Sequence, residues 1–308
     1  MEEPIEALDH LSFRISHPIH VTITLVMIPH PPDAASIALA NAVQRRLPRL
    51  LDKARRGEPL LSRARTVKAA RGPVRVSVDL GAGAFSQATY DFAFLCSGVS
   101  TPAELAASLE NDTYFDVVAN RIARVIADDQ SGRTEDAWYA EERSSGFLGL
   151  PAYAPTDPTD EWIGGLAPDT HGWSPRVAHI VTNDPRSVAQ AVIELSLDCA
   201  DDLAEPTLIA AGRRLAAQVR RGFQVQQRFH SIRGGVHYMH VGGAEMFCAP
   251  AADPNAAFVL HPDDFALHHT PPLVTASGGS LLARVDQQLV CTRRYLLGRL
   301  QQYDGLQY

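Results

Sequence analysis

Runs of apolar and β-branched residues mark the first predicted strands. Residues 11–16 (LSFRIS) alternate between apolar and polar positions, whereas residues 20–28 (HVTITLVMI) are almost continuously apolar. Alternation is typical of a strand with one buried face, and a continuous apolar run is typical of a fully buried strand. Residues 74–81 and 88–96 are predicted to be two further strands, joined by a Gly-rich hairpin.

Two helices are predicted among these strands. Asp33 is a typical N-cap residue for a helix over residues 34–56, and Pro48 is expected to kink or break that helix because proline lacks a backbone N–H. The sequence Thr-Pro-Ala-Glu at residues 101–104 has the N-cap, first-turn proline and acidic residue of a capping box. A second helix is therefore expected from there to about Asp128.

The same order of elements is predicted again in the C-terminal part of the chain. Residues 176–183, 236–241 and 257–262 are rich in β-branched and apolar residues, which favours strands. Helices are predicted over residues 185–199 and 206–228.

The last predicted element is a long helix over residues 279–303. Its apolar residues recur mostly at four-residue steps, which indicates one face of an amphipathic helix. These residues are Leu281, Val285, Leu289, Leu296 and Leu300.

Written as elements, residues 1–129 and residues 176–308 both follow the order β-α-β-β-α. Two such halves predict an α+β protein of tandem ferredoxin-like architecture, in which each half is an antiparallel sheet with helices on one face. Residues 130–175 are rich in Pro, Gly, Asp and Ser and contain all three tryptophans, so we expect an ordered, packed excursion rather than a bare linker. One mixed sheet wrapped by helices is the alternative architecture.

Chemically active side chains are densest in residues 228–270, which hold six of the twelve histidines. Within this stretch, paired glycines bracket the predicted strand at residues 236–241. Because side chains alternate along a strand, His237 and His240 are expected on opposite faces. The partner most readily available to His240 is Glu245, across the Gly-Gly turn.

A metal centre is one chemical hypothesis for this stretch. Two or three neutral imidazoles with one carboxylate suit Zn²⁺, Fe²⁺ or Mn²⁺ as a divalent cofactor. The candidate ligands are His237, His240, Glu245, His261, His268 and His269. The alternative is that these histidines only pack or hydrogen-bond, and that His-Pro-Asp-Asp at residues 261–264 begins a turn or helix with Asp as its cap.

Two known motifs come near this stretch, and neither is complete. The spacing from His240 to Glu245 and on to the later histidines resembles the paired motifs of cupins, but their His-x-His pair and a glycine near Pro262 are absent. Residues 261–264 resemble the zinc-binding motif of deacetylases that act on N-acetylglucosaminyl lipids, but Phe265 stands where that motif has Glu. No catalytic residue is assigned.

The formal net charge of −7 argues against a general nucleic-acid binder, which is usually basic overall. Basic residues nevertheless cluster between Arg45 and Arg71. If that cluster binds a ligand, we expect an acidic partner, a phosphate group or an RNA backbone. The candidate anion-binding residues are Arg55, Arg56, Arg63 and Arg65. A solvated helix face is the alternative.

Three functions therefore stay open. The first is a metal-dependent small-molecule enzyme with a His/Glu site in the C-terminal half. The second is a non-catalytic assembly or adaptor protein, which binds copies of itself or another protein, and the third is an anion- or RNA-binding module that uses the Arg-rich helices. The first residues lack an apolar signal segment, and no run of about 18 or more apolar residues occurs, so we expect a cytoplasmic protein with no membrane partner.

Overall fold

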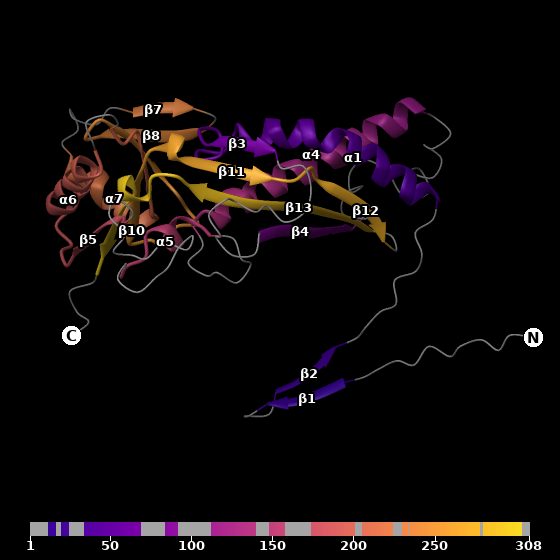
Figure 1. The fold of residues 1–308 in the computed structure, drawn as a ribbon, viewed down its shortest axis with the longest axis horizontal. Coiled ribbons are helices and arrows are strands. Elements are labelled where there is room, and N and C mark those ends of the chain that lie inside the picture. Colours follow the sequence, from indigo (N-terminus) through magenta and orange to yellow (C-terminus); the bar gives the residue numbers. More distant parts are fainter. Residues whose placement is uncertain are drawn as a thin grey trace, which may run out of the picture.

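The computed structural model describes much of the chain and places it in two sheets with helices packed on them (Figure 1). A sheet with α6 and α7 (bounds below) lies at one end of an elongated body, and a second sheet with α1 and α4 extends to the other end. The described residues are 12–16, 20–24, 34–68, 84–91, 112–139, 148–157, 174–200, 205–223, 230–233, 235–277 and 280–303.

Seven of the described strands form a mixed sheet in the order β5-β14-β10-β6-β9-β8-β7. They are β5 (Arg176–Ile180), β6 (Leu208–Ala211), β7 (His230–Arg233), β8 (Val236–Val241), β9 (Ala244–Cys248), β10 (Ala256–Leu260) and β14 (Gly298–Gln302). The helices α6 (Pro185–Asp198) and α7 (Arg213–Gly222) cover one face of this sheet.

Side chains on both faces of this sheet are buried. Leu208 and Ala210 of β6 belong to one hydrophobic cluster, whereas Ile209 and Ala211 belong to the cluster under α6 and α7. Strands that are buried on both faces require continuous apolar runs, and all the residues of β6 and β10 are buried. The strand predicted at residues 257–262 is confirmed as β10, whereas the helix predicted over residues 206–228 was wrong at its start, because residues 208–211 form β6 and α7 begins only at Arg213.

Five other described strands form the second sheet, in the order β12-β13-β11-β3, with β4 also paired to β13. They are β3 (Arg65–Lys68), β4 (Ala84–Asp91), β11 (Phe265–His269), β12 (Leu273–Ser277) and β13 (Ser280–Cys291). The helices α1 (Ala34–Arg55) and α4 (Asp112–Ala137) pack together against β12 and β13.

Shorter elements complete the described part of the chain. They are the hairpin of β1 (Ser12–Ser16) and β2 (His20–Thr24), the short helix α5 (Leu150–Tyr153), and the 3-10 turns η2 (Pro262–Asp264) and η3 (Arg294–Leu296). In the described residues β1 and β2 pair only with each other, and Figure 1 draws them apart from the two sheets.

The tandem ferredoxin-like prediction was wrong. Strand β3, from the first predicted half, pairs in parallel with β11 of the second half, and β4 pairs antiparallel with β13. The two halves therefore contribute to one sheet instead of forming two separate ones. Element order alone misled the prediction because it says nothing about which strands hydrogen-bond to each other.

The long C-terminal helix predicted over residues 279–303 was also wrong, since this segment forms β13, η3 and β14. Leu281, Val285 and Leu289 are four residues apart, which is close to one helical turn and is also two full periods of a strand. In the structure they lie in one strand and are buried. Pro48 likewise neither ends nor breaks its helix, because α1 runs through it to Arg55.

Other local predictions are confirmed. The predicted helix after Asp184 is α6, and the Asp184 side chain accepts a hydrogen bond from the Ser187 backbone N–H as an N-cap. The predicted strand at residues 236–241 is β8. Trp138, in the segment expected to pack, is 1% exposed and lies against Phe265, but residues 140–147 and 158–173 lie outside the described residues, so the packing of the whole segment stays a prediction. That segment begins later than predicted, because α4 continues to Ala137.

Several predicted features lie outside the described residues. They are Asp33, the strand at residues 74–81, the helix start at residues 101–104, Trp162 and Trp173.

Two glycines test how tightly this body is packed. A Cβ atom at Gly212, before α7, would lie 1.9 Å from the backbone oxygen of Asp253, whereas a Cβ at Gly132 in α4 would meet nothing within 4 Å. We expect Gly212→Ala to lower the free energy of unfolding by about 2 kcal/mol through overpacking. Gly132→Ala should raise it by about 0.5–1 kcal/mol, because alanine favours helix. Urea unfolding of both variants measures the difference, and equal effects would contradict this packing.

Candidate functional site

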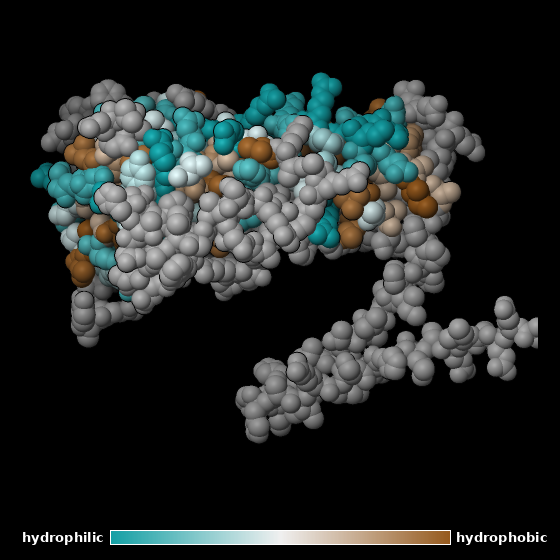
Figure 2. Space-filling view, in the orientation of Figure 1, coloured by the Kyte–Doolittle hydropathy of each residue, from teal (hydrophilic) through white to brown (hydrophobic). Residues whose placement is uncertain are grey.

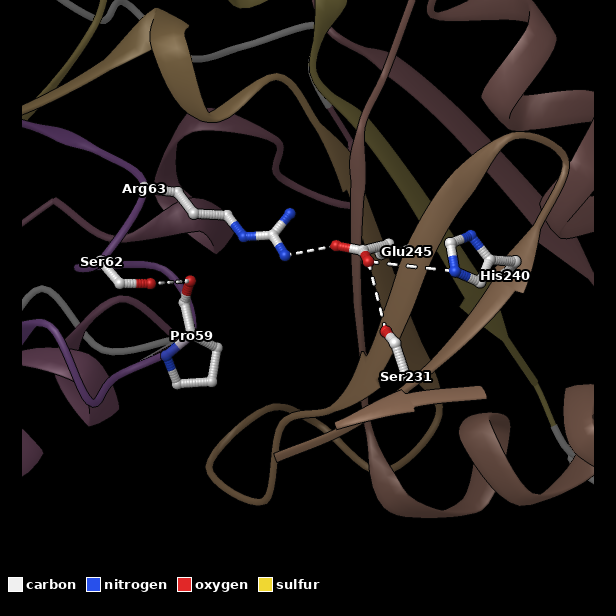
Figure 3. Close-up of polar contacts among 6 residues, drawn as sticks. All are labelled: Pro59, Ser62, Arg63, Ser231, His240 and Glu245. Carbon is white, nitrogen blue, oxygen red and sulfur yellow. Dashed lines mark hydrogen bonds and ion pairs between the residues drawn. The ribbon is translucent and has the colours of Figure 1, made fainter. Parts of the chain in front are cut away.

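Glu245 on β9 is the centre of a polar cluster that joins the two sheets (Figure 3). Arg63, in the turn after α1, donates a hydrogen bond to Glu245 Oε2. The hydroxyl of Ser231 on β7 donates to Glu245 Oε1 at 3.3 Å, and His240 Nε2 lies 3.9 Å from the same oxygen. The carboxylate is 8% exposed, so its charge depends on these neighbours.

The β8–β9 hairpin sets this geometry. Gly242 and Gly243 have φ values of 55° and 90°, in the left-handed region that glycine adopts without strain. The two-residue turn places His240 directly opposite Glu245 in the antiparallel register. The paired glycines thus bring the two side chains together, as their position in the sequence suggested.

Arg63 makes this cluster an ion pair rather than a metal site. Its guanidinium also lies over the Tyr238 ring, 5.2 Å from the ring centroid, so it contacts β8 as well as β9. An arginine that is both ion-paired and stacked is held in one orientation. Arg63 and Glu245, one from each of the two candidate sites in the sequence, therefore neutralise each other.

The remaining histidine candidates lie elsewhere. His237 is exposed on β8, opposite Ile232, and His261 is buried with its Nε2 3.2 Å from the Cys199 carbonyl oxygen. His268 and His269 lie on β11 in the other sheet.

The two β11 histidines differ in environment. His269 is buried, and its Nδ1 lies 3.0 Å from the Thr270 carbonyl oxygen. His268 is partly exposed, and burial together with the Arg65 cation lowers its pKa below the usual value. Both effects favour the neutral imidazole of His268, yet His268 belongs to no group of three His, Cys, Asp or Glu side chains that could hold a metal ion in the described residues.

The interpretation of residues 228–270 as metal-binding is corrected by this arrangement. Within the described ranges, no three His, Cys, Asp or Glu side chains lie close enough to hold a metal ion. The structure brings His240 to Glu245 but distributes the other candidates over two sheets. The His-Pro-Asp-Asp sequence forms the turn η2, as the alternative interpretation predicted, but the residue at its N-cap is His261 and not an Asp. Asp264 instead accepts a hydrogen bond from Arg293 Nε at 2.6 Å.

Glu135, near the end of α4, is a buried carboxyl group that was not predicted from the sequence. Its two carboxyl oxygens accept hydrogen bonds from the backbone N–H groups of Leu60 and Leu61, at 3.1 and 3.2 Å, and Tyr139 donates its hydroxyl at 3.3 Å. Burial raises the pKa of Glu135 to about 7, although the two backbone hydrogen bonds oppose the rise. One signal was available, because Glu135 continues the four-residue spacing of the buried residues Ala127 and Ser131.

Of the other candidate arginines, Arg55 and Arg56 line a pocket at the end of α1, whereas Arg65 does not. The pocket has a volume of about 360 Å³ and lies beside Arg55 and Arg56. Arg56 and Arg65 are exposed, whereas Arg55 is buried. The full lining is Asp52, Arg55, Arg56, Leu61, Ser62, Ala64 and Thr66.

The known proteins that resemble this chain do so in structure. No protein-family model and no curated protein matches its sequence. The capsid asymmetric unit of cyanophage A-1(L) is similar, with a TM-score of 0.53 and 13% identity over 78% of this chain and 90% of that one. The holo complex of the encapsulin SrpI from Synechococcus elongatus has a TM-score of 0.49 and 13% identity, over 81% and 88%.

The chain therefore has the mixed α/β, HK97-like capsid fold, built from a long helix and a large mixed sheet. This finding overturns the interpretation as a metal-dependent enzyme, together with the dispersed positions of the proposed ligands. No helix in the described part of the chain is long and apolar enough to span a bilayer.

Breaking the Arg63–Glu245 ion pair should destabilise the protein. Glu245→Gln leaves a mostly buried guanidinium without its counter-charge, and we expect it to lower the free energy of unfolding by about 3 kcal/mol. The exposed pair of Arg133 with Asp129, at 2.8 Å, is the control, and Asp129→Asn should cost less than about 1 kcal/mol. Adding Arg63→Met to Glu245→Gln should recover part of the loss in urea unfolding. Similar losses for the two pairs would contradict a structural role for Glu245.

Glu135 should make stability depend on pH. Its pKa is about 7 in the folded chain and 4.5 in an unperturbed carboxyl, so the folded state holds the proton more tightly. Its contribution is then fully present below about pH 4.5 and is lost as the pH rises to about 7, a change of roughly 3 kcal/mol. We expect Glu135→Gln to remove this fall in the free energy of unfolding, as measured by urea unfolding between pH 4.5 and 8. The exposed Glu194→Gln should keep it, and equal slopes in all three proteins would show that Glu135 is already ionised.

Proposed function

We propose that this chain is the subunit of a closed protein shell, assembled in the cytoplasm from many copies of itself and without a catalytic role. The observation that carries the proposal is the fold, which matches 90% of a phage capsid chain. A match over 90% of that chain and 78% of this one covers most of both folds, and is more than one shared motif. It corresponds to the second of the three functions that the sequence left open, the non-catalytic assembly protein.

Exposed apolar side chains at one end of the body support self-association. Ile37 on α1, Val117 on α4 and Leu273 on β12 are 46%, 57% and 54% exposed. The helix α1 packs against both α4 and β12, so these side chains belong to one end of the molecule, where Figure 2 shows hydrophobic residues at its surface. Large apolar side chains grouped on a surface are typical of protein interfaces.

The opposite end offers strand edges. The edge strands of the seven-stranded sheet are β5 and β7, and exposed apolar residues lie at both, Val181 directly after β5 and Ile232 within β7. An edge strand has unpaired backbone groups that a second chain can use. The hairpin β1–β2 adds two more such edges, and a two-stranded sheet is marginally stable until it packs on something else. Contacts at both ends allow one subunit to join several neighbours.

Solution mass and particle shape test this proposal. We expect the full-length protein to elute as a particle of many subunits, each of 33.5 kDa, with uniform hollow shells in negative-stain micrographs. A monomer or dimer at micromolar concentration, across a range of salt concentrations, would contradict it.

Two variants on α4 test the apolar end directly. Val117→Asp introduces a charge at an exposed apolar position, and we expect it to shift the protein from shells to free subunits, because a buried unpaired charge at an interface is costly. Asn120→Asp introduces the same charge at an exposed polar position one turn away, and should leave assembly unchanged. Light scattering measures both. Shells of normal yield from Val117→Asp would exclude this end as an interface.

A further inference from the structure

A buried arginine without hydrogen bonds lies in the wall of the pocket at the end of α1. Arg55 is 3% exposed, and its three guanidinium nitrogens have no hydrogen-bond partner in the described part of the chain. The nearest acidic group recorded for it is Asp52, whose Oδ1 lies 3.9 Å from Nη1, beyond hydrogen-bond distance. A buried cation without hydrogen bonds is costly, so this arrangement points to a missing anion.

Arg55 keeps its charge in this position. Burial lowers its pKa to about 10, and the charge of Asp52 opposes that change. A group with this pKa remains a cation at neutral pH. The cost of burial is therefore not relieved by loss of a proton, and an anionic ligand would relieve it.

The charged side chains around the pocket are positive overall and so favour an anion. Arg55 and Arg56 contribute two positive charges and Asp52 contributes one negative charge, which leaves a net charge of +1. The carbonyls of Lys53 and Ala54, in the last turn of α1, accept hydrogen bonds from the N–H groups of Arg56 and Gly57. These two carbonyls are therefore not left unsatisfied beside an anion that faces the arginines.

The number of donors distinguishes between ligands. Two guanidinium groups and the Thr66 hydroxyl offer more hydrogen bonds than the two oxygens of a carboxylate use in one orientation, and suit the oxygens of a phosphate. Ser62 also lines the pocket, but its hydroxyl donates to the Pro59 carbonyl at 3.1 Å (Figure 3). The pocket volume of about 360 Å³ leaves room for more than the phosphate group itself.

We propose that this pocket binds the phosphate group of a small phosphate ester, held by Arg55 and Arg56 with Thr66 at the rim. The residues that line the pocket do not include Arg63 or Glu245. A bound phosphate would therefore leave the ion pair between the two sheets intact. A volume near 360 Å³ is at the lower end of the range for small-molecule sites, roughly 300–1,000 Å³. The inference does not depend on the shell proposal, because every group it uses belongs to one subunit.

Calorimetric titration and thermal unfolding of the full-length protein test this inference. The probes are inorganic phosphate and adenosine monophosphate, with sodium acetate at the same ionic strength as the control anion. We expect saturable binding of both phosphates and a matching rise in the unfolding temperature. Arg56→Gln, at an exposed position, should weaken binding roughly tenfold. Arg45→Gln, an exposed arginine of α1 outside the pocket, should leave it unchanged.

Arg55→Met separates a binding role from a structural one. Because it removes an unpaired buried charge, we expect this variant to unfold at a temperature no lower than the wild type without phosphate, and to gain nothing when phosphate is added. A short single-stranded oligonucleotide distinguishes the source of the phosphate. Binding that Arg56→Gln weakens would assign the site to a nucleic-acid backbone instead of a free ester.

Three results would overturn the proposal. One is the absence of saturable phosphate binding by the wild type. Another is equal binding of acetate, which would make the pocket a carboxylate site. The third is an equal loss of affinity in Arg56→Gln and Arg45→Gln, which would show only general charge attraction.

Discussion

The strand β13 is the constraint on which the rest of the structure depends. Its twelve residues pair with β4, β11 and β12, so backbone hydrogen bonds to one strand hold together segments from distant parts of the chain. Side chains at different positions along one face of β13 also pack in two different hydrophobic cores. Leu281 and Val285 pack under α1 and α4, whereas Leu289 packs in the cluster shared with the seven-stranded sheet. A strand of this length therefore makes the two ends of the body one unit.

Polar contacts between the cores have the same effect. Gln287 of β13 shares hydrogen bonds with Thr134 of α4, at 3.0 and 3.1 Å, at the point where one apolar cluster gives way to the other. The next residue on α4, Glu135, accepts hydrogen bonds from backbone N–H groups of the segment after α1, and Arg63 of that segment donates to Glu245. Apart from the partly exposed Arg63, the side chains in these contacts are buried, and each has a partner of complementary chemistry, as buried polar groups require.

This organisation suits a subunit whose surfaces, and not a cleft, have the functional role. The apolar clusters inside the body are well covered, while exposed apolar side chains remain at its ends and at strand edges. A rigid body with apolar ends can meet identical neighbours in a fixed geometry, which a closed assembly requires. The polar groups that the sequence suggested as chemistry serve here mainly to fix elements to each other, and Arg55 is a buried group whose guanidinium has no hydrogen-bond partner among the described residues.

Local signals in the sequence determined the elements whose evidence is local. The cap at Asp184, the glycine turn between β8 and β9, and the doubly buried strand β10 each follow from the residues within a few positions of them. Contacts between residues far apart in the sequence cannot be predicted from local signals, and these contacts decided the fold. The four-residue spacing of Leu281 and Val285 is compatible with either helix or strand, and pairing with β4, about two hundred residues earlier in the chain, selects the strand.

The candidate site shows the same difference between local features and contacts of distant residues. The sequence correctly brought His240 and Glu245 to one turn, because the paired glycines and the strand period are local features. Only the tertiary structure decided what Glu245 does, since its counter-charge is Arg63, which lies 182 positions away in the sequence. Burial makes a carboxylate depend on the nearest available cation, and which cation is nearest is a property of the packed chain. The sequence determined which groups were present, and the fold determined which of them met.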